Sequence, residues 1–209
     1  MNEKKCVIAM FGCFNPPTNG HLHLLGLAHN KLRENGYEIE KGFFIPTNSG
    51  YSKPGLLSPA IRVEMCRLAS RSSDWIDVDP FETQQESWTR VIVTLEHLKQ
   101  IYPDYRIFIA CGADFVERWK EPCWAEEDCL RILKDFGLCI APRSESFGNF
   151  INEVPYLNSN LDNVFFLEHN SLFDLSSTKV RSMIEKNQDI VGLVPTTVEE
   201  YLRNKRLYK

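Results

Sequence analysis

The chain has 209 residues, a formal net charge of −4 and a hydrophobic fraction of 43%. This length and apolar content are sufficient for a folded core and predict one domain over residues 1–209. The negative balance argues against general binding to nucleic acid, which needs a basic surface. No stretch approaches the roughly 20 apolar residues of a membrane span. We therefore expect a globular protein that binds neither membranes nor nucleic acid.

The cysteines indicate a reducing compartment. There are seven, an odd number, with no C-x-x-C pair, and several lie in apolar runs. This usage is typical of buried thiols in a cytoplasmic or nuclear protein. The first residues lack the apolar run of a signal peptide, and we recognise no targeting segment. Cys123 and Cys129 have no histidine at ligand spacing, so no structural metal site is expected.

The first expected element is a strand over 7–11, VIAMF, a continuous apolar run suited to burial on both faces. Gly12 then permits a tight turn, and the proline pair at 16–17 ends either flanking element. Thr18 and Asn19 are N-cap residue types before a helical apolar stripe, which predicts a helix ending near 35–36.

This strand, loop and helix form an anion site in outline. Free amide groups and the positive end of the helix dipole would face the space above the loop. His21 lies in the first turn and is expected to point into the same space. A lone histidine there would be an ordinary surface residue, but the complete string GCFNPPTNGH, from Gly12 to His21, favours phosphate binding.

The rest of the chain alternates expected strands and helices. Strands are expected at 42–46, 75–79, 105–111, 137–141 and 164–167. Helices are expected to begin at Ser58, at Ser87-Trp88, at Glu126, at 175–178 and at Thr196, the last through a capping box with Glu199. Loops are expected at 47–57, 112–124 and 143–163, the last of them long and on the surface.

This alternation predicts an α/β fold, a doubly wound, Rossmann-like and mostly parallel sheet with helices on both faces. Ligands of such sheets lie beyond the carboxyl ends of the strands, where the winding direction switches. The loops after 7–11, 42–46 and 105–111 lie at such ends. In the helix after Ser58, the expected core face carries Ile61, Met65 and Leu68.

A second string, SSTKVR at 176–181, opens a late helix. Hydroxyl and amide groups at a helix start suit phosphate oxygens, and Lys179 and Arg181 add positive charge. Alone, the string is more often an ordinary capped helix with basic residues in solvent. Because it occurs together with the first string, we interpret it as a phosphate-binding motif.

Both strings resemble the paired signatures (H/T)-x-G-H and S-S-T-x-x-R of the nucleotidyltransferase superfamily. Within it, the chain is most similar to the nicotinamide mononucleotide adenylyltransferases of the eukaryotic type. The matching residues are Gly12–His21, Tyr51 with Lys53, Trp88, Gly112-Ala113-Asp114 followed by Trp124, and Ser176–Arg181. The resemblance implies transfer of AMP from ATP to nicotinamide or nicotinate mononucleotide, giving NAD or deamido-NAD and pyrophosphate with Mg²⁺. It thereby implies an enzyme of NAD biosynthesis, and we expect a homo-oligomer.

The resemblance also implies the site residues. ATP would lie against Gly12, Cys13, Phe14, Thr18, His21, Ser177, Thr178, Lys179 and Arg181. The mononucleotide would lie against Cys13, Tyr51, Lys53, Trp88, Val91, Gly112, Asp114 and Trp124. No metal ligand from the protein is expected, because Mg²⁺ would accompany ATP.

His21 and Arg181 are the expected catalytic residues. The acceptor phosphate is already anionic at neutral pH and needs no general base, so catalysis can rest on alignment and on charge neutralisation. Trp88 and Trp124 offer flat faces for a pyridine ring, a cation–π contact for the nicotinamide form, although either indole can also be plain core.

Three positions leave details open. Cys13 stands where relatives often have serine, and Val91 where some have threonine. Near Glu168-His169 the family usually has an acidic residue that contacts the nucleotide. The register here is ambiguous by one residue, so the contact falls on either Glu168 or His169.

Two alternatives stay open. One is another adenylyl- or cytidylyltransferase with the same phosphate motifs, such as one acting on phosphopantetheine; Trp88 and the Gly112–Trp124 string argue against it. The other is a non-catalytic, chaperone-like module on this fold. Such a protein would be expected to lose His21 or Arg181, and both are present. The preference for nicotinamide or nicotinate is not readable from the sequence.

Overall fold

The computed structural model describes residues 4–50, 54–142, 154, 156–158, 161–168 and 175–209. Its strands are β1 (Lys4–Gly12), β2 (Tyr37–Pro46), β3 (Ile76–Val78), β4 (Arg106–Gly112), β5 (Gly137–Ala141) and β6 (Val164–Phe166). Its α-helices are α1 (Asn19–Glu34), α2 (Pro59–Ser70), α3 (Val91–Ile101), α4 (Ala113–Glu117), α5 (Glu126–Asp135), α7 (Ser177–Glu185) and α8 (Thr196–Asn204). Within the described residues, no helix has the length and apolar character needed to cross a membrane.

The strands form one six-stranded sheet in the order β3-β2-β1-β4-β5-β6, and every neighbouring pair is parallel. The chain winds outward from β1 to β3, returns to the centre and winds the other way from β4 to β6. The predicted doubly wound, Rossmann-like α/β sheet is therefore confirmed. The winding direction switches between β1 and β4, the place where such sheets bind ligands.

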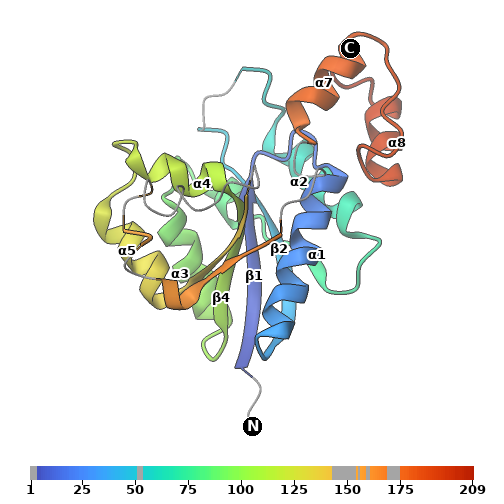
Figure 1. Cartoon of the computed structure of the whole chain (residues 1–209). Coiled ribbons are helices and arrows are strands. Elements are labelled where there is room, and N and C mark those ends of the chain that lie inside the picture. The colour runs from blue at the N-terminus through green and yellow to red at the C-terminus, as the bar shows by residue number, and fades with distance from the viewer. Residues whose placement is uncertain (1–3, 51–53, 143–153, 155, 159–160, 169–174) are drawn as a thin grey trace.

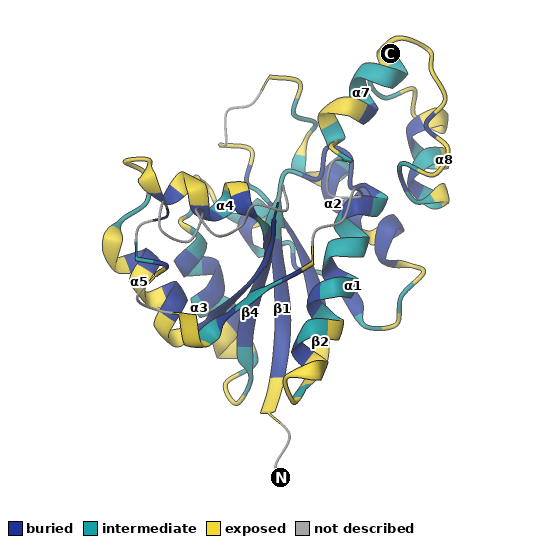
Figure 2. Ribbon diagram, viewed as in Figure 1, coloured by how far each residue is buried: buried dark blue, intermediate teal, exposed yellow. Residues whose placement is uncertain are grey.

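Helices cover both faces of the sheet, as predicted (Figure 1). Along β1, Cys6, Ile8 and Met10 belong to the core under α1, α2 and α8, whereas Val7 and Ala9 belong to the core under α3 and α5. Because successive side chains of a strand point to opposite faces, an unbroken apolar run is what a two-sided core requires. Figure 2 shows the resulting buried sheet between its helical layers.

The helix expected to open at Ser87-Trp88 instead begins at Val91, with Arg90 as its N-cap in an extended conformation. Two contacts keep the preceding residues out of the helix. The backbone of Trp88 packs against Gly50, and Arg90 Nη1 lies 2.9 Å from Asp128 Oδ2. Tertiary contacts therefore override the serine as a start signal.

Three further expectations need correction. The N-cap of α8 is Pro195, so the capping box of Thr196 and Glu199 is wrong; Glu199 pairs with Arg203 at 2.6 Å instead. The loop expected at 112–124 contains α4 and a 3₁₀ turn, Arg118–Lys120. The stretch at 143–163 is not wholly on the surface, because Val154 and Leu157 are buried in the core.

Candidate active site

The loop after β1 is shaped by Phe14. This residue adopts a left-handed backbone conformation, with φ of 46°, and its side chain is buried. Its ring packs edge-on against Phe44 and against the imidazole of His21, at centroid distances of 5.0 and 5.2 Å. A Cβ on Gly12 would lie 3.1 Å from this ring, a tight contact, so glycine leaves room for the ring over the end of β1.

His21 is held by the N-terminus of its own helix. The Thr18 amide donates to His21 Nδ1 at 2.9 Å, and Thr18 Oγ1 lies 2.8 Å from the same nitrogen. The predicted N-cap, Thr18, is confirmed, but histidine takes the place usually occupied by glutamate in a capping box. Since an amide can only donate, Nδ1 is the acceptor and the ring proton lies on Nε2.

Burial lowers the pKa of His21 from 6.5 to about 4, outweighing a smaller raising contribution from the Thr18 backbone. His21 is therefore neutral at physiological pH in the free protein. Sequence reasoning expected a charge donor here, whereas the geometry provides a fixed neutral N–H donor. Thr18 is fully buried, so its side chain serves the imidazole rather than the solvent-facing site.

The N-terminus of α1 is less open than expected. The Asn19 amide donates to the carbonyl of Leu193 at 3.0 Å, and its side-chain amide donates to Gly192 at 2.8 Å. This amide is therefore already used by the segment before α8. The expectation of free amide groups at this helix start is wrong for Asn19.

The second motif lies against the first. Ser176 is the N-cap of α7 as predicted, accepting from the Lys179 amide at 3.2 Å. Ser177 Oγ donates to the carbonyl of Pro16 at 2.7 Å. Arg181 Nη1 donates to the carbonyl of Asn15 at 2.9 Å, across 166 residues of sequence. The two strings thus form one surface at the carboxyl end of β1.

Two basic side chains of α7 differ in restraint. Arg181 is half-buried, and its Nη2 donates to Thr178 Oγ1 at 3.3 Å. Lys179 is exposed, as is Thr178. Arg181 is therefore fixed beside the loop after β1, whereas Lys179 projects into solvent.

The end of β4 carries the residues expected to hold the acceptor. A Cβ on Gly112 would lie 2.6 Å from Asp114 Oδ1, so the carboxylate folds back over the glycine. Asp114 is exposed in the first turn of α4. Trp124 is half-buried and packs edge-on against Phe115 at 5.2 Å, so one of its contacts is with the core.

The other expected acceptor residues come from β2 and the start of α3. Trp88 is 44% exposed and lies beside Gly50, while Val91 is half-buried as the first residue of α3. Thr47 Oγ1 donates to the Cys13 sulfur at 3.7 Å, which joins the loop after β2 to the phosphate loop. The predictions for Tyr51 and Lys53, and for His169, lie outside the described residues.

Sequence reasoning missed three polar residues that join these loops: Asn15, Asn48 and Arg62. Arg62 is completely buried and donates to three carbonyls. It shares the buried face of α2 with Met65, Cys66 and Ala69. An arginine at the i, i+3, i+4, i+7 spacing of that apolar stripe was the signal. Asn15 lay within the first motif but was read only as part of its turn.

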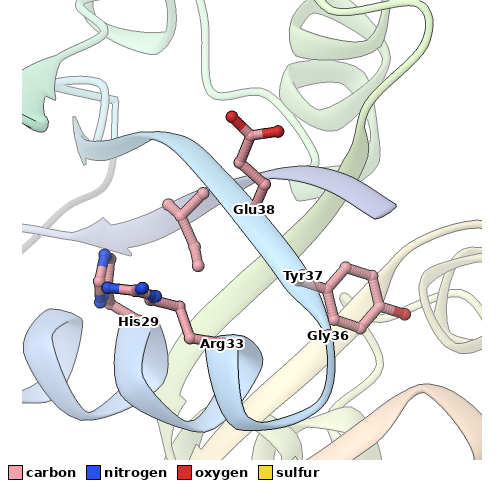
Figure 3. Close-up of a pocket in the computed structure, with 6 residues that line it drawn as sticks. His29, Arg33, Gly36, Tyr37 and Glu38 are labelled. Carbon is pink, nitrogen blue, oxygen red and sulfur yellow. The ribbon is translucent and has the colours of Figure 1, made fainter. Parts of the chain in front are cut away.

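Other concave surfaces lie away from this site. A pocket of about 310 Å³ at the amino end of β2 is lined by His29, Arg33 and Glu38 among others. Figure 3 shows His29 and Arg33 projecting from α1 toward the strand, with Tyr37 turned away from them. Among the described residues, no group of three or more His, Cys, Asp or Glu side chains is placed to hold a metal ion.

The comparison with known proteins decides the family. The model of the family described as cytidylyltransferase-like matches residues 9–183, which includes both motifs. The chain belongs to this family. The Arabidopsis thaliana nicotinamide/nicotinic acid mononucleotide adenylyltransferase is 32% identical, over 99% of this chain and 91% of that protein. The Bos taurus nicotinamide/nicotinic acid mononucleotide adenylyltransferase 1 is 31% identical, over 99% and 90%.

Solved structures agree with this cytidylyltransferase-like fold. The Plasmodium falciparum nicotinic acid mononucleotide adenylyltransferase complexed with NaAD has a TM-score of 0.70 to this chain. The match covers 98% of this chain and 97% of that one at 17% identity. At that identity the likeness concerns the fold.

Proposed function

We propose that this chain is an adenylyltransferase that transfers AMP from ATP to nicotinamide or nicotinate mononucleotide. The products are NAD or deamido-NAD and pyrophosphate, so the enzyme serves NAD biosynthesis. The observation that carries the proposal is the meeting of both phosphate motifs at Asn15 and Pro16. Arg181 and Ser177 donate to these two carbonyls, so α7 and the start of α1 face one common space.

The reaction needs positioning more than proton transfer. An oxygen of the acceptor phosphate attacks the α-phosphorus of ATP, and the bond from that phosphorus to pyrophosphate breaks. The attacking oxygen is already anionic, so no side chain must remove a proton from it. Fixed donors around the α-phosphate then stabilise the charge that develops in the transition state.

His21 and Arg181 are the donors we assign to this task. Nε2 of His21 carries the ring proton, and the Thr18 amide fixes the ring so that it needs no reorganisation. Arg181 brings a full positive charge and is held by Asn15 and Thr178. A neutral and a charged donor, both preorganised, suit an α-phosphate that carries one negative charge before attack.

Mg²⁺ would be bound by the triphosphate oxygens and would supply charge neutralisation of the leaving pyrophosphate. Lys179 is exposed at the start of α7, and we assign it to the outer phosphates.

We assign the acceptor to the space between the ends of β1, β2 and β4. Asp114 is a hydrogen-bond acceptor at the end of β4, and the exposed Trp88 offers its indole face from the opposite loop. Trp124 would complete the wall from its packing against Phe115. Through the family resemblance alone, Tyr51 and Lys53 are assigned to the mononucleotide, with Lys53 on its phosphate.

The test is pyrophosphate release from MgATP with a panel of acceptors. We expect release with nicotinamide mononucleotide, nicotinate mononucleotide or both, and none with phosphopantetheine or with no acceptor. Release with phosphopantetheine alone would assign the chain to another nucleotidyltransferase. Absence of release with every acceptor would favour a non-catalytic role.

A further inference from the structure

One buried guanidinium holds together loops that our proposed function assigns to different substrates. Arg62 is 0% exposed, although it lies in the first turn of α2 directly below the site. A charged side chain is rarely buried completely unless its donors are satisfied, because leaving water is costly. What Arg62 bonds to therefore indicates why it is there.

The Arg62 side chain donates to three main-chain carbonyls. Nη1 donates to Cys13 in the phosphate loop at 3.1 Å, and Nη2 donates to Thr47 after β2 at 2.6 Å. Nε donates to Leu57, just before α2, at 2.9 Å. A planar guanidinium with several fixed N–H groups can bond three segments in one geometry, which an ammonium cannot.

Asn15 joins the same segments from the other side. Its Nδ2 donates to the carbonyl of Gly55 at 2.9 Å, and its Oδ1 accepts from the Leu57 amide at 3.2 Å. Oδ1 also accepts from the hydroxyl of Tyr208 at 2.7 Å, and the main-chain oxygen accepts from Arg181. The loop after β1 and residues 55–57 are thus joined by two side chains, Arg62 from α2 and Asn15 from the loop itself.

We propose that Arg62 and Asn15 form a loop brace, a pair of positioning residues that sets the distance between the ATP and acceptor phosphates. The brace links the loop after β1, assigned to ATP, with Thr47, Gly55 and Leu57, which flank in sequence the residues assigned to the acceptor. Neither side chain needs to touch a reacting atom. A displacement of about 1 Å between reacting groups lowers rates by up to roughly 10²-fold, so the brace acts on alignment.

Arg62→Lys tests the geometry while keeping the positive charge. We expect kcat to fall about 10- to 100-fold at a temperature well below the unfolding midpoint, with much smaller changes in the KM values for ATP and mononucleotide. Arg62→Met should behave the same way. If Arg62→Met does not fold, Asn15→Ala breaks the brace from the other side and should give the same kcat loss.

Leu98→Ala is the matched control. Leu98 is buried in α3 on the opposite face of the sheet, so the variant loses core packing without touching the brace. Its Tm should fall at least as far as that of Arg62→Lys, with kcat unchanged. The proposal is overturned if Arg62→Lys keeps kcat within about threefold of wild type, or if its kcat loss is matched by Leu98→Ala.

The kinetic test rests on the proposed function. A second measurement does not depend on it. Hydrogen exchange of peptides covering residues 54–57 should be at least about tenfold faster in Arg62→Lys and in Asn15→Ala than in wild type. If wild type lacks transferase activity but exchange responds, the proposed function and the positioning role both fail, and Arg62 and Asn15 remain only a structural link between the two loops. If wild type is active and exchange does not respond, the brace fails.

Discussion

At the scale of single residues, the structure defines the protonation state of His21. The Thr18 amide bonds to His21 Nδ1, and burial lowers the pKa of the imidazole to about 4. A folded-state pKa below the ordinary value means that the neutral ring persists through neutral pH and is lost only as pH falls through about 4.

An NMR titration of the imidazole carbons should therefore show one histidine with a midpoint near 4 in the free protein. The signal is assigned by its absence in His21→Gln. The pKa of the same histidine in the unfolded chain is near 6.5. Because the unfolded chain therefore binds a proton first, the free energy of unfolding falls as pH falls from 6.5 toward 4. A midpoint near 6.5 for the His21 signal would contradict the burial of the imidazole.

His21→Ala should retain the fold and lose most of its turnover. Removing one preorganised donor typically costs about 2.7–4 kcal/mol in barrier, or roughly 10²–10³ in kcat. His29→Ala is the control, since His29 lies further along α1 against Trp75, away from the phosphate loop. Steady-state kinetics with both substrates checks this, and turnover of His21→Ala within threefold of wild type would remove His21 from the mechanism.

At the scale of elements, the end of β4 gives a test of the acceptor pocket. Gly112→Ala would place a methyl group 2.6 Å from the present position of Asp114 Oδ1 and displace that carboxylate. We expect KM for the mononucleotide to rise by about tenfold or more, because a hydrogen bond to a charged group is worth roughly 1.5–3 kcal/mol. KM for ATP should change little.

Gly26→Ala in α1 is the matched glycine control. A Cβ at Gly26 meets no atom within 4 Å. Alanine there should leave both KM values unchanged and stabilise the fold by about 0.5–1 kcal/mol, as measured by denaturant unfolding. Equal changes in KM for both substrates in Gly112→Ala would argue that Asp114 does not discriminate between them.

These elements also show how far the sequence alone could lead. The apolar run of β1, the caps Thr18 and Ser176 and the order of strands and helices were readable, because each depends on local pattern. The start of α3 was not, because the contact of Trp88 with Gly50 is tertiary. The use of the Asn19 amide by Leu193 was hidden for the same reason.

The candidate site divides in the same way. Its two phosphate strings were recognised from order and spacing, while Arg62 was not, because an arginine in a helix is normally a solvent residue. Its place on the stripe of Met65 and Cys66 was the only local clue. The neutral state of His21 depends on the burial of its ring, which a motif does not specify.

At the scale of the whole molecule, the buried carboxyl group of Glu82 makes the free energy of unfolding depend on pH. Glu82 is buried, and burial raises its pKa from 4.5 to about 7, against the lowering effects of the Asn48 hydrogen bond and of Arg62. Because the pKa of Glu82 is higher in the folded than in the unfolded state, its contribution to the free energy of unfolding is fully present below about pH 4.5. That contribution is lost as pH rises through about 7.

Glu82→Gln should therefore gain stability relative to wild type between pH 5 and pH 9, by up to about 3 kcal/mol. Denaturant unfolding at both pH values measures the difference, which cancels groups common to both proteins. Glu86→Gln, at an exposed position in the same segment, is the control and should show no such change. A Glu82→Gln difference that is the same at both pH values would show that Glu82 titrates normally.

The most direct test of the whole account is formation of the dinucleotide itself. Purified protein with MgATP and nicotinamide mononucleotide should produce NAD, detected through its enzymatic reduction to NADH, in one-to-one ratio with pyrophosphate. Nicotinate mononucleotide, with mass detection of deamido-NAD, is the parallel reaction. NAD or deamido-NAD that requires both ATP and the acceptor is the predicted result; pyrophosphate or phosphate release without either dinucleotide would contradict the account.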